Sequence, residues 1–253
     1  MDTWYIITLF SAFIVGTVMG SFSNVCIYRI PLQLSIVQPG SYCPACKTPL
    51  AVLDNIPVLS YIFLRGECRY CLSRISWRYP LVELLSGIFY LLLYIKFDIP
   101  VFIIYTLLVT SLIIITFIDI DHKIIPNVIT LPGIPIGLVL AYFFLPHTIK
   151  SALLGLFGGG GLLLLMAVIY PGGMGGGDIK MIAMLGAFLG WEKVFLTIFS
   201  GSLIGSIIGI AMIILKKGGR KTKIPFGPYL ASGAILSIFF GNTLIDYYVN
   251  FTF

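Results

Sequence analysis

Two groups of aspartates in this sequence have the types and positions needed for acid–base chemistry. Asp178 follows a run of glycines and begins an apolar stretch, while Asp119 ends another apolar stretch and precedes Asp121 by two residues. Two carboxylates held close together can share one proton, which leaves one acid and one base. Such a pair can hydrolyse a peptide bond, because the ionised carboxylate takes a proton from the attacking water and the protonated one donates to the carbonyl oxygen. No serine or cysteine nucleophile is then required.

Each aspartate also has a purely structural interpretation. Asp178 can cap a helix N-terminus, although a cap does not need the five glycines of residues 172–177, which let another backbone approach closely. Asp119 can belong to an interfacial polar patch with residues 121–123. An ionisable group costs roughly 2.5–3.5 kcal/mol at the centre of a membrane span, however, so Asp119 is a functional candidate. Asp119 and Asp121 cannot both face Asp178, since residues two apart point to different sides of a helix, and depth favours Asp119 modestly.

Four of the five cysteines form two C-x-x-C pairs separated by 21 residues. Two residues between the cysteines let both sulfurs of a tight turn face one ion, and four thiolates complete a tetrahedral zinc site without an open position for water. The loop is too small to bury a sufficient core alone, so a metal would stabilise it. Redox-active or unliganded thiols are the alternative, and Cys26 is expected to pack within a span. The predicted structural zinc ligands are Cys43, Cys46, Cys68 and Cys71.

The composition places these groups in a membrane protein. Over 253 residues, 58% are hydrophobic and 10% are charged, and the mean hydropathy is +1.04, far outside the range of soluble proteins. We expect an all-α polytopic protein with about eight transmembrane helices, since one crossing takes about 20 apolar residues. The start of the chain shows no removable signal peptide, so the first span is expected to remain. The predicted spans lie near residues 4–28, 80–97, 99–118, 124–145, 151–170, 179–191, 194–215 and 228–247.

The distribution of lysine and arginine predicts the orientation in the bilayer. With the N-terminus outside and eight spans, thirteen basic residues face the cytoplasm and three face outward, as the positive-inside rule requires. This rule also explains the net charge of +6 without nucleic acid as a partner. The same threading places Asp119 at the cytoplasmic end of the third span and Asp178 at the cytoplasmic start of the sixth. Both carboxylates are therefore expected at one membrane face. This agreement is independent evidence, because the orientation is derived from lysine and arginine and not from the acids.

Several motifs, in this order, resemble the type IV prepilin peptidase family over nearly the whole chain. The matching stretches are residues 20–31, the two C-x-x-C pairs with 55–58 between them, 78–83, 118–122 with 125–127, 175–180 and 225–229. The resemblance implies an intramembrane aspartic endopeptidase of the bacterial cytoplasmic (inner) membrane, which cuts the charged leader of prepilins or pseudopilins after a glycine on the cytoplasmic side. The family's catalytic pair falls on Asp119 and Asp178, with a supporting loop of Gly175, Gly177 and Lys180.

The resemblance also implies a second activity, N-methylation of the new N-terminal residue with S-adenosylmethionine, which is associated with the zinc-bearing loop. The sequence carries no Rossmann fingerprint for the methyl donor, so its binding residues are unassigned. Glu83, Lys180 and Arg78 are unranked candidates for reading charge on the substrate, and a cap or a salt bridge explains Glu83 more simply. The expected parts are residues 1–28, the first transmembrane helix; 29–79, the cytoplasmic zinc-binding and methyltransferase-associated loop; and 80–253, the peptidase core.

Three other functions are open to a protein of this composition. A monofunctional prepilin peptidase would cleave without methylating. A transporter would relay ions through acids at mid-bilayer and often carries inverted repeats, whereas here the acids gather at one face and no internal repeat is visible. A structural scaffold would dock a partner through the zinc loop and use the aspartates only as caps. The sequence does not indicate the oligomeric state or the pilus, secretion or competence system served.

Overall fold

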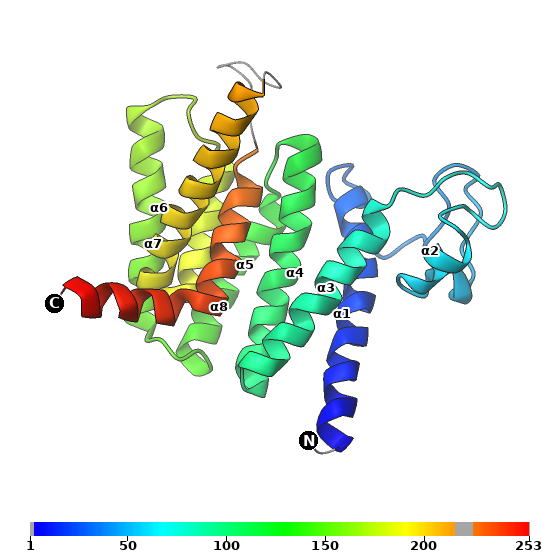
Figure 1. Ribbon diagram of the computed structural model, residues 1–253. Helices are drawn as coiled ribbons and strands as arrows, with labels where there is room; N and C mark the ends of the chain where they lie inside the picture. The colour runs from blue at the N-terminus through cyan, green and yellow to red at the C-terminus, as the bar shows by residue number, and fades with distance from the viewer. Residues whose placement is uncertain (1–2, 216–224, 253) are drawn as a thin grey trace. The chain divides into compact units, whose positions relative to one another are not determined.

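The computed structural model describes residues 3–215 and 225–252, and within these the only regular elements are helices. The predicted all-α fold is confirmed for this part of the chain, where the only β pairing consists of isolated bridges. Figure 1 shows the order of the elements. They are α1 (Thr3–Arg29), η1 (Val52–Asn55), α2 (Leu59–Phe63), α3 (Arg78–Lys96), α4 (Ile99–His122), α5 (Asn127–Phe143), α6 (Ile149–Ile169), α7 (Gly176–Ile214) and α8 (Gly227–Thr252).

Six of the described helices, α1, α3, α4, α6, α7 and α8, are long and apolar enough to cross a membrane. α5 is apolar but has only 17 residues. The chain is therefore a multi-pass membrane protein. The basic loop on which the predicted orientation depends in part, with Lys216, Lys217, Arg220, Lys221 and Lys223, lies outside the described residues.

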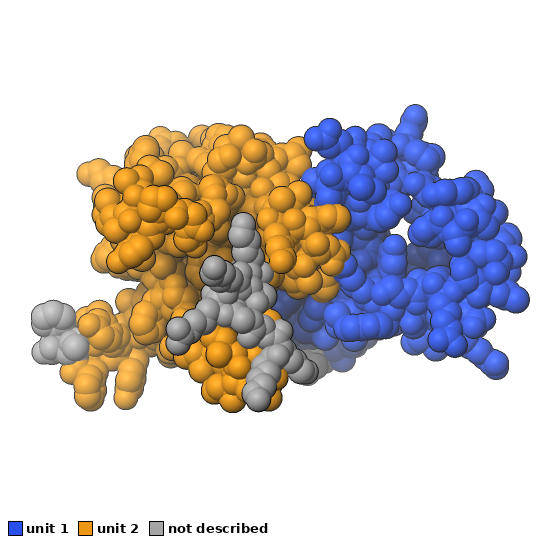
Figure 2. Space-filling view, turned by 90° about the horizontal axis from the view of Figure 1, so that it is seen from above, with its two compact units in different colours: residues 1–114 blue, residues 115–253 orange. Residues whose placement is uncertain are grey.

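The chain forms two compact units, residues 1–114 and residues 115–253, which Figure 2 shows in different colours. The first unit contains α1, the cysteine loop and α3. Its two long helices pack closely because small residues line their contact: a Cβ atom at Gly20 would lie 2.6 Å from the Cα atom of Glu83, and one at Gly16 would lie 2.7 Å from the carbonyl oxygen of Ser86. Such small-residue contacts are typical of helices that pair inside a bilayer.

In the second unit, α7 packs against α5, α6 and α8. α7 is interrupted at Gly190, whose φ of 79° and ψ of 174° are not helical. Cβ atoms built at Gly159 of α6 would contact both Ile182 at 3.0 Å and Val194 at 3.2 Å. In a straight helix these two residues would be about 18 Å apart, so the chain turns back at Gly190 and α7 is a pair of helical segments.

This turn agrees with the sequence-based division of the region into residues 179–191 and 194–215. Its positive φ favours glycine, and the surrounding contacts leave no room for a side chain, since a Cβ atom at Gly190 would lie 2.6 Å from the Ser151 hydroxyl oxygen. With both segments and α5 counted, the described residues contain eight apolar helical segments. That each of them crosses the membrane stays a prediction.

Candidate active site and metal centre

Asp119 lies in the last turn of α4, in the part that belongs to the unit of residues 115–253. Its side chain is held inside the protein, with the residue only 5% exposed. Its Oδ2 atom accepts a hydrogen bond of 2.9 Å from the backbone N–H of Gly227, the first residue of α8. The carboxylate is therefore fixed by a segment 108 residues further along the chain.

Asp178 lies in the first turn of α7 and is 9% exposed. Its Oδ2 atom accepts a hydrogen bond of 3.1 Å from the backbone N–H of Gly175, the residue before the helix. This is the acidic half of a capping box, in which a carboxylate three residues inside the helix binds the N-cap N–H. The structural interpretation of Asp178 as a helix cap is thus correct in part, because the residue caps from inside the helix.

The two carboxylates lie near enough for the negative charge of Asp119 to repel that of Asp178 through space. Asp119 is at the end of α4, while Asp178 and the Gly227 N–H are at the starts of α7 and α8. Helix N-termini carry a partial positive charge, which compensates part of this repulsion. A buried pair of carboxylates beside helix N-termini is an arrangement in which one group can hold a proton while the other stays ionised.

The start of α5 is joined to the same site. Lys180 donates a hydrogen bond of 2.9 Å from Nζ to Oδ1 of Asn127, the first residue of α5. Beside it, a Cβ atom at Gly177 would lie 2.8 Å from the Cβ atom of Ile125. Gly177 and Lys180, both predicted as supporting residues, therefore connect the start of α7 to the segment that precedes and begins α5.

Sequence reasoning missed the contributions of Gly227 and Asn127 to this site. Both belong to stretches that carry the family resemblance, residues 225–229 and 125–127, but no local pattern linked them to the aspartates. Gly227 is required at its position because a Cβ atom there would lie 2.7 Å from Oδ2 of Asp119. In the sequence, Gly227 is only a glycine of unknown role in the stretch 225–229. Its contact with Asp119 becomes apparent only in the folded structure.

The neighbours of Asp119 are not part of the buried site. Asp121, His122 and Lys123 are all exposed. Lys123 has a positive φ of 55° and follows the end of α4. These three residues fit the interfacial patch considered from the sequence, whereas Asp119 does not.

The four cysteines predicted as zinc ligands come together in the unit of residues 1–114. Their Sγ atoms all lie within 4.8 Å of one another, and the Sγ atoms of Cys43 and Cys71 are 3.9 Å apart. A tetrahedral zinc ion with Zn–S bonds of about 2.3 Å requires sulfur–sulfur distances of about 3.8 Å. The cluster, which also contains Cys46 and Cys68, therefore has the size and donor set for one zinc ion.

The two halves of the cluster repeat each other, although the sequence shows no obvious repeat. In each half, the backbone N–H four residues after the first cysteine donates to that cysteine's carbonyl oxygen: Lys47 donates to Cys43 and Leu72 to Cys68, each at 2.9 Å. Lys47 and Leu72 both have a positive φ, of 61° and 57°. Each half is closed by one β bridge, Tyr42 with Pro49 and Glu67 with Arg74.

Backbone N–H groups in these turns point at the sulfurs and favour thiolates, the form that binds metal. The N–H of Cys46 is the largest influence that lowers the pKa of the Cys43 thiol, to about 6. The Ser73 hydroxyl lowers the pKa of Cys71, and their Sγ and Oγ atoms are 3.1 Å apart. The pKa of the Cys68 thiol is raised, by burial and by its contacts with Cys43 and Cys71, so the environment favours thiolates at Cys43 and Cys71.

The side chains considered for reading substrate charge all have partners within the protein. Oε2 of Glu83 accepts a hydrogen bond of 2.7 Å from the backbone N–H of Val58, which has a positive φ of 61°. Glu83 thus holds the loop before α2 against α3. Lys180 binds Asn127, and Arg78 also takes part in an interaction.

Models of two protein families match the chain in succession. The bacterial peptidase A24 N-terminal domain matches residues 14–97, and the type IV leader peptidase family matches residues 106–210. The first match contains the four cysteines, and the second contains Asp119 and Asp178. No solved structure matches the chain significantly.

Curated proteins from several bacteria are similar to almost the full chain. A prepilin leader peptidase/N-methyltransferase of Bacillus subtilis is 36% identical over 239 residues, covering 94% of this chain and 96% of the relative. One of Pseudomonas aeruginosa is 34% identical over 270 residues, covering 94% and 92%. A third, of Myxococcus xanthus, is 39% identical over 220 residues, covering 83% of this chain and 65% of the relative.

Proposed function

The chain belongs to the type IV leader peptidase family, and from this we propose that it is an intramembrane aspartic endopeptidase that removes the leader from prepilins or pseudopilins. The observation that carries the proposal is the pairing of two buried aspartates at adjoining helix ends. Asp119 and Asp178 interact through their charges, and each is fixed by a backbone N–H from a glycine. Both oxygens are positioned by the fold before any substrate binds.

In the proposed reaction, one aspartate is ionised and the other protonated. The ionised carboxylate removes a proton from water as the water oxygen attacks the carbonyl carbon of the glycine that ends the leader. The protonated carboxylate donates to the developing oxyanion. When the tetrahedral intermediate breaks down, a proton passes to the departing amine, which becomes the new N-terminus. Burial excludes competing water and strengthens both interactions.

We further propose that the protein methylates this new N-terminus, with S-adenosylmethionine as the methyl donor. The names of the relatives combine a leader peptidase with an N-methyltransferase, and the four cysteines implied for the bifunctional type come together here. The cysteines would hold zinc as a structural ion, since four thiolates leave no coordination position for substrate or water. The ion would fix the fold of the loop that surrounds it.

The proposed location is the bacterial cytoplasmic membrane, with the active site facing the cytoplasm. The six long apolar helices place the chain in a bilayer, and the predominance of lysine and arginine in the loops predicted as cytoplasmic supports the orientation. A prepilin-like substrate would then present its charged leader on the cytoplasmic side.

The test compares cleavage by four proteins reconstituted in lipid vesicles with a prepilin-type substrate: the wild type, Asp119→Asn, Asp178→Asn and Asp121→Asn. Loss of an acid or base in the pair should lower the rate by roughly 100-fold to 10,000-fold. Asp121→Asn changes the net charge equally at an exposed position and should cleave normally. Mass spectrometry of the product reveals methylation as a gain of about 14 Da, since one methyl group replaces one hydrogen.

Normal cleavage by Asp119→Asn or by Asp178→Asn would exclude the aspartic mechanism. An unmethylated product from the wild type with S-adenosylmethionine present would leave a monofunctional peptidase. Loss of cleavage in Asp121→Asn to the same degree as in Asp119→Asn would mean that the experiment does not single out Asp119, and the assignment of the acid–base role to Asp119 would fail.

A further inference from the structure

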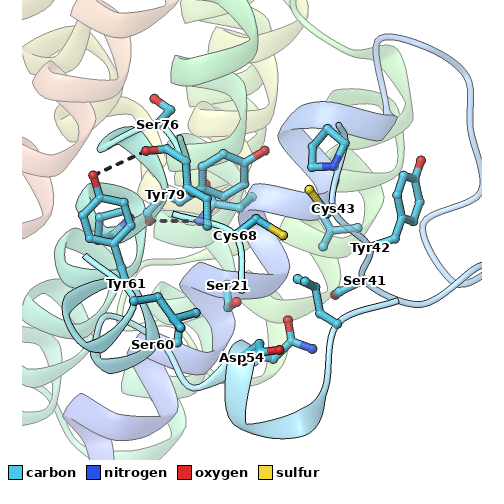
Figure 3. Close-up of a pocket in the computed structure, with 18 of the residues that line it drawn as sticks. Ser21, Ser41, Tyr42, Cys43, Asp54, Ser60, Tyr61, Cys68, Ser76 and Tyr79 are labelled. Atoms are coloured by element: carbon cyan, nitrogen blue, oxygen red, sulfur yellow. Dashed lines mark hydrogen bonds between the residues drawn. The ribbon is translucent and has the colours of Figure 1, made fainter. Parts of the chain in front are cut away.

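The unit of residues 1–114 contains a partly open cavity of about 290 Å³ next to the cysteine cluster. Its wall is formed by the end of α1, the two cysteine turns, η1, α2 and the start of α3. Figure 3 shows Tyr61 and Tyr79 on one side of it, Tyr42 and Cys43 on the other, and Asp54 at the lower border. The volume is at the lower end of the range for small-molecule sites.

Asp54 belongs to the wall of this cavity and has an unsatisfied acceptor. Its side chain is only 2% exposed, and its Oδ1 atom accepts a hydrogen bond of 2.8 Å from Nε of Arg69. Its Oδ2 atom is buried and has no hydrogen-bond partner among the described residues. A buried carboxylate oxygen without a partner is costly, so a ligand that brings a donor or a positive charge to Oδ2 would bind favourably.

The wall contains tyrosines, which suit a cation that carries an aromatic ring, and it also contains Arg29, Arg69 and Arg74, which suit a carboxylate on the same molecule. Tyr61 and Tyr79 provide aromatic faces, which attract cations and stack with planar bases. The tyrosine hydroxyl of Tyr61 donates to the Ile75 carbonyl at 3.4 Å, and the side-chain amide of Asn24 donates to the Tyr79 carbonyl at 3.0 Å. These bonds tie the cavity wall to the second cysteine turn and to α1.

We propose that this cavity is the binding site for the methyl donor, with Oδ2 of Asp54 facing a positively charged group of S-adenosylmethionine and the tyrosines contacting its adenine or its sulfonium. The inference rests on the methyltransferase activity proposed above. Cys43 and Cys68 belong both to the cavity wall and to the cysteine cluster, so a zinc ion in the cluster would fix the shape of the donor site. This explains physically why a methylating enzyme would keep four cysteines that perform no chemistry.

The transfer balances without a further reactant. The neutral N-terminal amine of the cleaved substrate forms an N–C bond with the methyl carbon of the donor while the C–S bond breaks. The electron pair of that bond goes to sulfur, which becomes a neutral thioether. The amine nitrogen takes the positive charge and then releases one proton to water.

The test measures binding of S-adenosylmethionine by equilibrium dialysis to the zinc-loaded, full-length protein in lipid nanodiscs. Asp54→Asn keeps the size of the side chain and an acceptor for Arg69 but removes the charge at Oδ2. We expect it to weaken binding roughly tenfold or more, as for a lost hydrogen bond to a charged group. Leader cleavage and zinc content should stay at wild-type levels. Asp98→Asn, at an exposed position of the same unit, is the matched change in charge and should bind normally.

A second variant separates donor binding from a purely structural role of Asp54. Arg69→Gln removes the ion pair with Asp54 but leaves the carboxylate in place. If Asp54 faces the donor, Arg69→Gln retains more of the binding than Asp54→Asn does. Equal losses in both variants, together with lower zinc content, would mean that Asp54 only anchors the cysteine turn, and the proposal would be wrong.

The outcomes for the wild type distinguish the inference from the function on which it rests. If the wild type cleaves and methylates but Asp54→Asn binds the donor with unchanged affinity, the cavity is not the donor site and the methyltransferase activity stands. If the wild type neither binds the donor nor methylates, both proposals fail, while peptidase activity can still be scored from cleavage alone.

Discussion

The aspartate site and the cysteine site are held together in opposite ways. Asp119 is fixed by Gly227, 108 residues away, and Lys180 by Asn127, 53 residues away. The cysteine cluster lies within residues 43–71, and each half is shaped by backbone hydrogen bonds that span four, five and nine residues of its own turn. The aspartate site is thus a product of helix packing, whereas the cysteine site is a local fold that a metal would complete.

Because they are held together differently, the two sites should be sensitive to different changes. Packed apolar helices keep their positions without a ligand, because their backbone hydrogen bonds are internal. A small loop without a sufficient core depends on its metal, since binding energy and folding energy are then the same. Damage to one site should therefore leave the other largely intact, and the following experiments test that independence.

The largest effect is expected from loss of the metal. Cys68→Ser, or removal of zinc with a chelator, should abolish methylation, because structural zinc contributes about 10–16 kcal/mol to folding in small zinc domains. Cleavage of a prepilin substrate should fall by no more than about threefold, as the aspartates keep their partners. The measurements are zinc content, limited proteolysis of the loop, and mass spectrometry of the product.

Cys26→Ala is the matched control, since Cys26 is buried in α1 and lies outside the cluster. It should bind zinc and methylate as the wild type does. If Cys68→Ser lost cleavage as completely as methylation, the aspartate site would depend on the metal as the cysteine site does. The two sites would then not be independent.

An intermediate effect is expected at the glycine that fixes Asp119. In Gly227→Ala, the added Cβ atom would lie 2.7 Å from Oδ2 of the carboxylate and must displace it. A misplacement of about 1 Å can cost about 100-fold in rate, so kcat for cleavage should fall by roughly 10-fold to 100-fold. Separate measurement of kcat and KM checks this, since a positioning defect lowers kcat more than it changes KM.

Gly161→Ala provides the control for this substitution. Gly161 is in α6, and a Cβ atom there would have no neighbour within 4 Å, so cleavage should be unchanged. Methyl-donor binding should be normal in both variants. A Gly227→Ala protein with wild-type kcat would show that the hydrogen bond to Asp119 does not position the carboxylate for catalysis.

The same contrast explains how much the sequence predicted. The cysteine ligands were identifiable because C-x-x-C spacing is itself the geometry of a metal-binding turn. The apolar spans were also visible, and the break between residues 191 and 194 is close to the turn at Gly190. Gly227 and Asn127 could not be assigned, because their contacts exist only once α4, α5, α7 and α8 have packed. The choice of Asp119 over Asp121 from the sequence depended on depth and on family resemblance.

The cavity beside Asp54 was invisible in the sequence for a similar reason. Asp54 belongs to the short helix η1, which has no recognisable binding motif, and its carboxylate pairs with Arg69 of the second cysteine turn. Zinc ligands can be read from spacing, but a cavity is a consequence of how the zinc-bound turns lie against α1 and α3. Metal ligands close together in the sequence can therefore be predicted from it, whereas a cavity formed by several packed elements cannot.

The smallest effect is expected at the hydrogen bond between the start of α7 and the start of α5. Lys180→Met keeps the length of the side chain but removes the hydrogen bond from Nζ to Oδ1 of Asn127. Because this bond is exposed to solvent, its loss should cost about 0.5–1 kcal/mol, the lower part of the usual range for a hydrogen bond, and cleavage should fall about twofold to fivefold. Lys150→Met, at an exposed position in α6, removes an equal charge and should cleave normally.

If Lys180 instead bound the acidic part of a substrate, KM would rise far more than kcat fell, and Asn127→Ala would not reproduce the defect. Similar modest losses in Lys180→Met and Asn127→Ala would show that the hydrogen bond between these two residues has a structural role. It would then be one of the long-range contacts that hold the aspartate site in place.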